Sequence, residues 1–141
     1  MFSETGLTVR YAETDRMGIV HHSVYAIWFE VGRSEFLQRL GSSYSEIEAS
    51  GVNMPLTELT CRFCGSATYE DEIVVRTSIT NLTCARMEFG YEVFKKGVAS
   101  PITTGTTTLA FTDDSLKVIN LKKKRPEMYD MMQKAFAGEE K

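Results

Sequence analysis

Hydrophobic and polar residues follow two different periods along this chain, and each period predicts one kind of element. Between residues 23 and 40, apolar side chains recur at steps of three and four, as they do on a helix with a broad apolar face. That face carries Tyr25, Trp28, Phe29, Gly32, Phe36, Leu37 and Leu40. Ser23 is expected to cap the helix and Gly41 to end it. A second, short helix is expected over residues 44–49.

After Pro55 the pattern changes to the alternation that is typical of strands with one buried face. The segments with this pattern are rich in Thr, Val, Ile, Phe and Tyr and comprise residues 56–64, 73–80, 87–94 and 103–111. A shorter alternating segment, residues 7–11, precedes the long helix, and Pro126 suits the first turn of a closing helix. One strand, a long helix and then an antiparallel meander predict an α+β domain, with the sheet wrapped around the long helix.

Length and composition narrow the class of function. The 141 residues, 43% hydrophobic and 25% charged, fit one globular domain over residues 1–141 without repeats or linkers. A net charge of −3, from 16 Lys and Arg against 19 Asp and Glu, argues against a nucleic-acid partner. No apolar run is long enough to cross a membrane, and the first residues lack the pattern of a signal peptide. Three cysteines, an odd number, favour a reduced, cytoplasmic protein.

The loop between the first strand and the long helix holds the residues with the clearest chemistry. Asp15 lies in this loop, and Gly18 follows it three residues later. Backbone N–H groups at a helix start lack intrahelical partners and carry partial positive charge, so they can polarise a carbonyl. A nearby carboxylate can then act as general base toward water or attack that carbonyl. The residues alone leave open a second interpretation, in which Asp15 only forms a local cap or turn.

The same segment resembles the signature of the 4-hydroxybenzoyl-CoA thioesterase family of hotdog-fold acyl-CoA thioesterases. The matching run is Tyr11-x3-Asp15-x2-Gly18-Ile19-Val20-His21-His22-x2-Tyr25-x2-Trp28-Phe29-Glu30-x2-Arg33. The likeness continues through about residues 5–125, which is nearly the whole chain. It implies a hotdog fold, in which a long central helix is wrapped by an antiparallel sheet.

The resemblance also implies roles for individual residues. Asp15 matches the catalytic carboxylate, and His22 matches the position whose backbone N–H polarises the thioester carbonyl. Gly18 would let the loop turn tightly and the substrate approach the backbone. Tyr25 would line the acyl pocket, and His21 would pack beside it or line it. Such enzymes use no metal and no prosthetic group, and they form homodimers or homotetramers with sites between protomers.

Two features of the strand around residue 61 need separate interpretation. Relatives usually carry a proline, and no second cysteine, in the stretch that matches residues 63–68. The resemblance therefore does not predict which residues here contact coenzyme A. Cys61 and Cys64 also form a CxxC motif. On a strand, however, residues three apart point to opposite faces and lie about 10 Å apart, too far for a disulfide or a shared metal. We therefore expect core or half-buried thiols.

Other charged residues compete for roles in the site. Glu30 lies on the long helix, where some hotdog thioesterases carry the catalytic carboxylate, but Arg33 one turn later is expected to pair with it. Glu13 is a weaker rival to Asp15. The basic run of residues 122–125 would suit the phosphates of coenzyme A, or it is simply a solvated segment.

The sequence thus predicts an acyl-CoA thioesterase that hydrolyses a coenzyme A thioester to the free acid and coenzyme A. An acyl-carrier-protein thioesterase would catalyse the same hydrolysis on an acyl group attached to a carrier protein instead of coenzyme A. A hotdog hydratase or dehydratase also pairs Asp with His, but its Asn-Pro between the two is absent here. A non-catalytic acyl-CoA-binding module is the remaining alternative. The acyl group depends on pocket volume, which the sequence does not reveal.

Overall fold

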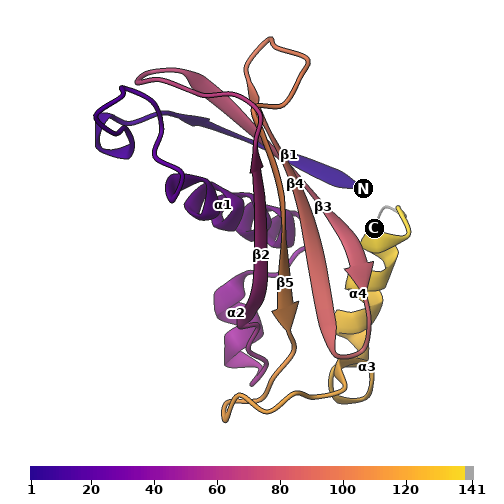
Figure 1. Cartoon of the computed structure of the whole chain (residues 1–141). Helices are drawn as coiled ribbons and strands as arrows, with labels where there is room; N and C mark the ends of the chain where they lie inside the picture. Colours follow the sequence, from indigo (N-terminus) through magenta and orange to yellow (C-terminus); the bar gives the residue numbers. More distant parts are fainter. Residues whose placement is uncertain (139–141) are drawn as a thin grey trace.

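The computed structural model describes residues 1–138, which form one curved sheet with helices around it (Figure 1). In chain order its elements are β1 (Phe2–Thr8), η1 (Tyr11–Glu13), α1 (Val24–Arg39), α2 (Tyr44–Ala49), β2 (Leu56–Phe63), β3 (Glu72–Leu82), β4 (Arg86–Lys95), β5 (Thr103–Ala110), α3 (Leu121–Lys124) and α4 (Pro126–Phe136). The five strands pair in the order β1-β3-β4-β5-β2, and every pair is antiparallel. The α+β prediction is confirmed, and β1 and β2 are the two edges of the sheet.

The long helix α1 packs against the inner face of the sheet. Phe29 stacks on Tyr91 of β4 with ring centroids 4.2 Å apart, and Phe36 meets Phe89 edge to face at 5.6 Å. Aromatic pairs in these geometries add to the stabilisation that comes from burial itself. Because the sheet curves around the helix, side chains on several sides of α1 are buried, namely Val24, Tyr25, Trp28, Phe29, Gly32, Arg33, Phe36 and Leu37. This explains the broad apolar face in the sequence.

The first strand lies earlier in the chain than the alternation at residues 7–11 predicts. β1 spans residues 2–8 and pairs with β3, with Thr5 opposite Val75. Its inner positions hold the buried polar residues Ser3 and Thr5, whereas Phe2 is exposed. Leu7 continues this inner row against the core, so the strand is not visible from hydrophobic alternation because two of its three inner positions are small and polar.

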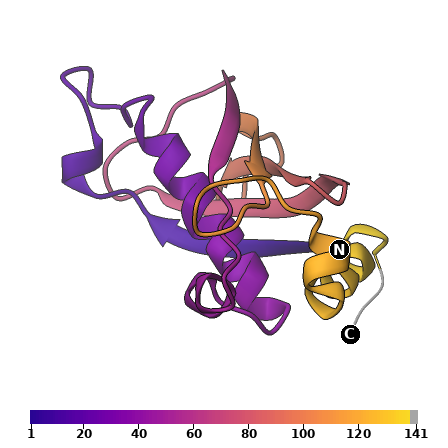
Figure 2. The same cartoon turned by 90° about the horizontal axis from the view of Figure 1, so that it is seen from below.

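The other predicted elements agree with the sequence pattern to within two residues at each end, whereas η1 and the short helix α3 were not predicted. The short helix over residues 44–49 is confirmed, as are the closing helix from Pro126 and the four later strands. Seen from below, α4 lies beside the N-terminus of the chain, away from the loop that precedes α1 (Figure 2). In the described part of the chain no helix combines the length and apolarity needed to span a bilayer.

Gly32 marks the closest approach of α1 to the sheet and gives a test of this packing. A Cβ at residue 32 would lie 2.5 Å from Thr77 Oγ1 and 3.0 Å from Val75 Cγ1, both buried on β3. Overpacking costs about 1–3 kcal/mol, and the better helix propensity of alanine offsets about 1 kcal/mol of it. Gly32→Ala should therefore lower the free energy of unfolding in urea by up to about 2 kcal/mol. Gly6→Ala, where a Cβ meets no atom within 4 Å, is the matched control, and equal losses in both would contradict this packing.

Candidate active site

The loop that carries Asp15 is a tight hairpin between η1 and α1. The Asp15 N–H donates to the Ile19 carbonyl at 2.9 Å, and the Gly18 N–H donates to the Asp15 carbonyl at 2.9 Å. Gly18 has φ +80°, a left-handed conformation that glycine adopts without strain. A bridge from Ile19 to Thr68 fastens the hairpin to the segment after β2. Asp15 is thus held on a rigid turn.

The carboxylate of Asp15 is anchored at one oxygen only. Its Oδ1 accepts a hydrogen bond from the Met17 N–H at 2.8 Å, inside the turn. Among residues 1–138, Oδ2 has no hydrogen-bond partner and no cation within ion-pair distance. A carboxylate that is oriented by one oxygen and open at the other can accept a proton or act as a nucleophile.

The start of α1 presents unpaired N–H groups, and the N–H of His22 is one of them. The His21 N–H donates to the Glu13 carbonyl at 2.9 Å, and the Val24 N–H donates to the His21 carbonyl at 3.0 Å. The Ser23 N–H donates to His21 Nδ1 at 3.2 Å. Within the described residues, no acceptor takes the N–H of His22. Contrary to the sequence prediction, the Ser23 side chain does not cap the helix, because Ser23 itself is helical (φ −67°, ψ −21°) and its hydroxyl lies 2.8 Å from His21 Nδ1.

A cavity of about 150 Å³ joins these two features. Its lining comes from the hairpin, the start of α1 and the end of β2, and comprises Asp15, Met17, Ile19, Val20, His22, Tyr25, Phe63, Gly65 and Ser66. Asp15, His22 and Tyr25 were candidates from the sequence, and the structure brings all three together. Gly18 and His21 do not line the cavity: Gly18 shapes the turn, and the His21 imidazole faces Ser23. Residues 63–66 belong to the stretch that the sequence linked to coenzyme A contacts, but their place beside Asp15 was not predicted, because they lie about 40 residues away in sequence without a motif.

Tyr25 forms the inner wall of the cavity. Its ring meets Phe63 edge to face at 5.5 Å and Trp28 at 5.0 Å. Burial raises the pKa of Tyr25 above its usual value, the Thr103 hydroxyl opposes this, and the Cys61 thiol adds to it. Tyr25 is therefore a neutral phenol at physiological pH, suited to an apolar pocket with one polar end.

Glu13 is structural. Its side chain is buried, its Oε2 accepts from Trp28 Nε1–H at 3.0 Å, and its Oε1 accepts from the Arg10 N–H at 2.8 Å. The Arg10 guanidinium lies 3.5 Å from the same carboxylate. Both oxygens are thus engaged by the loop and by α1, Glu13 does not line the cavity, and it ties the loop to α1.

Glu30 and Arg33 do not form the ion pair that their spacing predicts. Arg33 turns into the core, where its Nε–H donates to the Tyr44 hydroxyl of α2 at 2.9 Å. Glu30 is exposed on the opposite side of α1, in a shallow groove with Ile27 and Val31. The helical spacing placed the two residues one turn apart, but the tertiary packing drew one of them inward. Glu30 is also absent from the Asp15 cavity.

The basic run lies far from the cavity within this chain. Residues 121–124 form α3 at the bottom of Figure 1, whereas the hairpin with Asp15 lies at the upper left. Arg125 donates to the carbonyl of Ser50, and Lys122 lies over the Tyr129 ring at 5.9 Å. In one protomer this run therefore does not reach a ligand bound beside Asp15.

The cysteines carry free thiols. Cys61 is half-buried on β2, and burial raises the pKa of its thiol, while Cys64 is exposed just beyond the strand. Over residues 1–138 no three His, Cys, Asp or Glu side chains gather closely enough to bind a metal ion.

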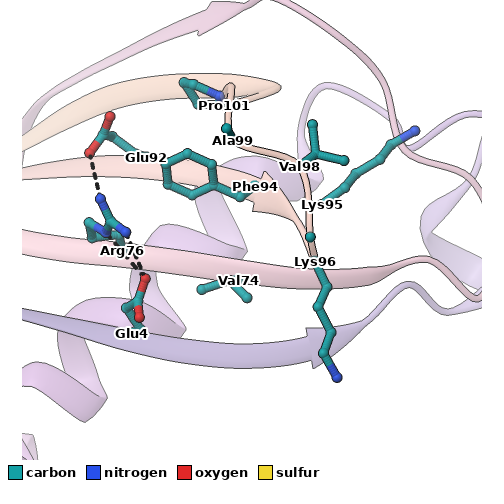
Figure 3. A pocket seen from close by; sticks show the side chains of 11 residues that line it. Glu4, Val74, Arg76, Glu92, Phe94, Lys95, Lys96, Val98, Ala99 and Pro101 are labelled. Atoms are coloured by element: carbon teal, nitrogen blue, oxygen red, sulfur yellow. Dashed lines mark hydrogen bonds and ion pairs between the residues drawn. The ribbon is translucent and has the colours of Figure 1, made fainter.

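A larger cavity, about 570 Å³, lies on the outer face of the sheet (Figure 3). Arg76 sits in it between Glu4 and Glu92, at 3.0 and 3.9 Å, and its guanidinium lies 5.0 Å from the centre of the Phe94 ring. Glu4 and Glu92 are its neighbours on β1 and β4, so the ion pairs link three adjacent strands. None of the candidate catalytic residues lines this cavity, and its central cation is already neutralised. The smaller cavity at Asp15 is therefore the candidate active site.

Comparison with known proteins agrees with this geometry. A family model described as the thioesterase superfamily (4HBT) matches residues 17–102. The chain belongs to this superfamily. The resemblance seen in the sequence is thereby confirmed, and the protein is a thioester hydrolase with the hotdog fold of these enzymes.

Individual members of the superfamily match over most of the chain. YneP of Bacillus subtilis is 32% identical over 133 residues, which cover 94% of this chain and 96% of YneP. The solved structure of a DHNA-CoA thioesterase from Staphylococcus aureus superposes with a TM-score of 0.91 at 34% identity, covering 96% of this chain and 91% of that one. The chloroplastic acyl-acyl carrier protein thioesterase ATL3 of Arabidopsis thaliana is 31% identical over 120 residues, 85% of this chain and 63% of ATL3.

The buried carboxylate of Glu13 provides a test of how the loop is held. Glu13→Gln keeps the shape but replaces one acceptor oxygen by an NH₂ group, which then faces the N–H of Trp28 or of Arg10. Loss of a buried, charge-assisted hydrogen bond should lower the free energy of unfolding by about 2–3 kcal/mol. Urea titration followed by Trp28 fluorescence measures this. Glu30→Gln, at an exposed glutamate of the same domain, should change it by less than about 0.5 kcal/mol. Equal stability of the two variants would contradict the anchoring role.

Proposed function

We propose that this thioesterase hydrolyses an acyl-CoA, with Asp15 and the backbone N–H of His22 as its catalytic groups. The observation that carries the proposal is their meeting in one cavity. One carboxylate oxygen of Asp15 has no partner in the described chain, the His22 N–H has none either, and both residues line the same 150 Å³ space. Hydrolysis of a thioester needs an electrophilic partner for the carbonyl oxygen and a base or nucleophile beside its carbon.

In the proposed reaction the thioester oxygen accepts the His22 N–H. The N-terminal end of α1 adds partial positive charge where the oxyanion develops. By one route Asp15 removes a proton from water, the water oxygen bonds to the carbonyl carbon, the C–S bond breaks, and the proton passes to the thiolate. By the other route Asp15 itself attacks, the thiolate leaves, and water hydrolyses the resulting mixed anhydride. Both routes give the free acid and the coenzyme A thiol.

The walls of the cavity suit an acyl group. Tyr25 and Phe63 supply aromatic surface, and Met17 and Ile19 supply aliphatic surface from the hairpin. Because these side chains offer few hydrogen bonds, they would select the acyl group mainly by size and shape. Gly18 contributes through the turn that places Asp15.

We further propose that the site is completed by a second copy of the chain. β2 is an edge strand, and its inner row of Leu56, Leu59 and Phe63 stays 45%, 41% and 51% exposed. Such an apolar edge is normally covered by another strand or chain. Phe63 also lines the Asp15 cavity, so a protomer that pairs along β2 would reach the site. A homodimer with sites between protomers follows, and the pairing of dimers into tetramers is a separate question.

An acyl carrier protein is the second candidate for the carrier of the acyl group in the substrate. The similarity to ATL3, an acyl-acyl carrier protein thioesterase, favours it, and the groups at the thioester would be the same. The two substrates would differ only in the part that contacts the surface around the cavity. A carrier protein would need a docking surface, whereas coenzyme A needs a path for its phosphates.

Asp15→Asn tests the catalytic assignment. Asparagine keeps the Oδ1 that accepts the Met17 N–H, so the hairpin stays in place, but it cannot take a proton or form the anhydride. Thiol release from benzoyl, hydroxybenzoyl and graded straight-chain acyl-CoAs should fall roughly 100-fold or more. Glu30→Gln is the matched control, since it removes the rival carboxylate on α1, and it should retain the wild-type rate. If Glu30→Gln is the inactive variant, the catalytic role moves to Glu30.

The same panel separates the alternatives. Thiol release from acyl-carrier-protein substrates alone would identify an acyl-carrier-protein thioesterase. Hydration of an enoyl-CoA without thiol release would identify a hydratase. Tight coenzyme A binding without any turnover would identify a binding module.

Leu59→Glu tests the dimer. The charge would lie on the exposed inner row of β2, so sedimentation should shift from dimer to monomer, and thiol release should fall with it. Val118→Glu, at an apolar side chain that is also exposed but lies outside the strands, should remain dimeric and active. A wild-type protein that is monomeric and fully active would contradict the proposed interface.

A further inference from the structure

The imidazole of His21 is exposed at the start of α1, contacts Ser23 and does not line the cavity. Its Nδ1 accepts the Ser23 N–H at 3.2 Å and lies 2.8 Å from the Ser23 hydroxyl. Its ring packs on the His22 ring, with centroids 4.0 Å apart. A side-chain acceptor at a helix start usually comes from Ser, Thr, Asp or Asn, so the imidazole here takes over a capping role.

These contacts fix both peptide planes that flank the α-carbon of His22. The first plane contains the His21 carbonyl and the His22 N–H, which point in opposite directions because the peptide is planar and trans. Since the His21 carbonyl accepts the Val24 N–H at 3.0 Å, the direction of the His22 N–H is set. The second plane contains the Ser23 N–H, which the His21 imidazole holds.

The result is a selection among four consecutive N–H groups. Those of His21, Ser23 and Val24 are bonded to the Glu13 carbonyl, the His21 imidazole and the His21 carbonyl, respectively. The N–H of His22 is left without an acceptor in the described chain, as is that of Tyr25 in the first turn of α1, and both residues line the cavity.

We propose that His21 is a positioning residue for thioester hydrolysis: by binding the adjacent Ser23 amide it holds the second peptide plane of the turn, and so stabilises the turn in which the His22 N–H faces the substrate carbonyl. The inference rests on the proposed function. It assigns His21 a role through the main chain, without direct contact with the acyl group.

The proposal requires one tautomer. An N–H donated to Nδ1 needs a lone pair there, so the proton of neutral His21 must lie on Nε2, and the Ser23 hydroxyl then acts as a second donor. Asparagine offers an acceptor at the same distance along the side chain, because its Oδ1 branches from Cγ as Nδ1 does. His21→Asn therefore preserves the contact, and His21→Leu removes it at similar volume.

Kinetics with acyl-CoA substrates test the role in catalysis. For His21→Leu we expect kcat to fall about tenfold, the equivalent of losing one good cap, with KM changed less than about twofold. His21→Asn should recover most of the loss, and Ser23→Ala, which keeps the amide, should lose less than His21→Leu. A raised KM with unchanged kcat, or no rescue by asparagine in a folded protein, would overturn the proposal in favour of direct substrate contact.

Nuclear magnetic resonance tests the hydrogen bond between the Ser23 amide and the His21 imidazole without any substrate turnover. The ¹⁵N shifts of His21 should show the Nε2–H tautomer, and exchange of the Ser23 amide with solvent should be slow in wild type and His21→Asn but faster in His21→Leu. An Nδ1–H tautomer in an active wild-type enzyme overturns the positioning role and leaves the proposed function intact. A wild type with the expected tautomer and protected amide, but without thiol release from any substrate, overturns the proposed function instead.

Discussion

The arrangement of the site depends on one buried carboxylate, that of Glu13, which receives hydrogen bonds from the loop on one oxygen and from α1 on the other. A buried charge is stable only when its lone pairs are filled, so the loop and the helix cannot separate without leaving it unsatisfied. The Glu13 carbonyl also accepts the N–H of His21. The distance between the Asp15 turn and the start of α1 is thereby set by a residue that does not line the cavity.

In the proposed reaction, the residues that hold the site in place differ from those that react. The Asp15 carboxylate is oriented by a single N–H of its own turn, and the proposed hydrogen-bond donor to the thioester carbonyl is a main-chain N–H rather than a side chain. Main-chain donors held by a helix start need no reorganisation as charge develops on the substrate. The surrounding side chains are then free to vary with the acyl group, which is consistent with superfamily members that are named for different substrates.

The curvature of the sheet has two consequences for function. On its inner face it wraps α1, so that Phe29 and Tyr91 fill the space beneath the helix. At its β2 edge it leaves an apolar row that the chain itself does not cover, and this row runs into the cavity at Phe63. The outer face carries paired charges around Arg76, which hold strands together without offering a free charge to a ligand. The edge of the sheet, rather than its faces, is where the site and a second copy would meet.

The sequence by itself determined the element order, the long helix and the candidates Asp15, His22 and Tyr25, because these depend on local periodicity and on one contiguous motif. The start of β1 could not be predicted from hydrophobic alternation, because its buried residues Ser3 and Thr5 are polar.

Tertiary structure alone decided the remaining features. It buried Glu13, drew Arg33 away from Glu30, brought Phe63 to the cavity and turned the His21 ring toward Ser23. Each of these is a contact whose partner lies on another element or whose direction is set by packing, and spacing along a chain carries no information about direction in space.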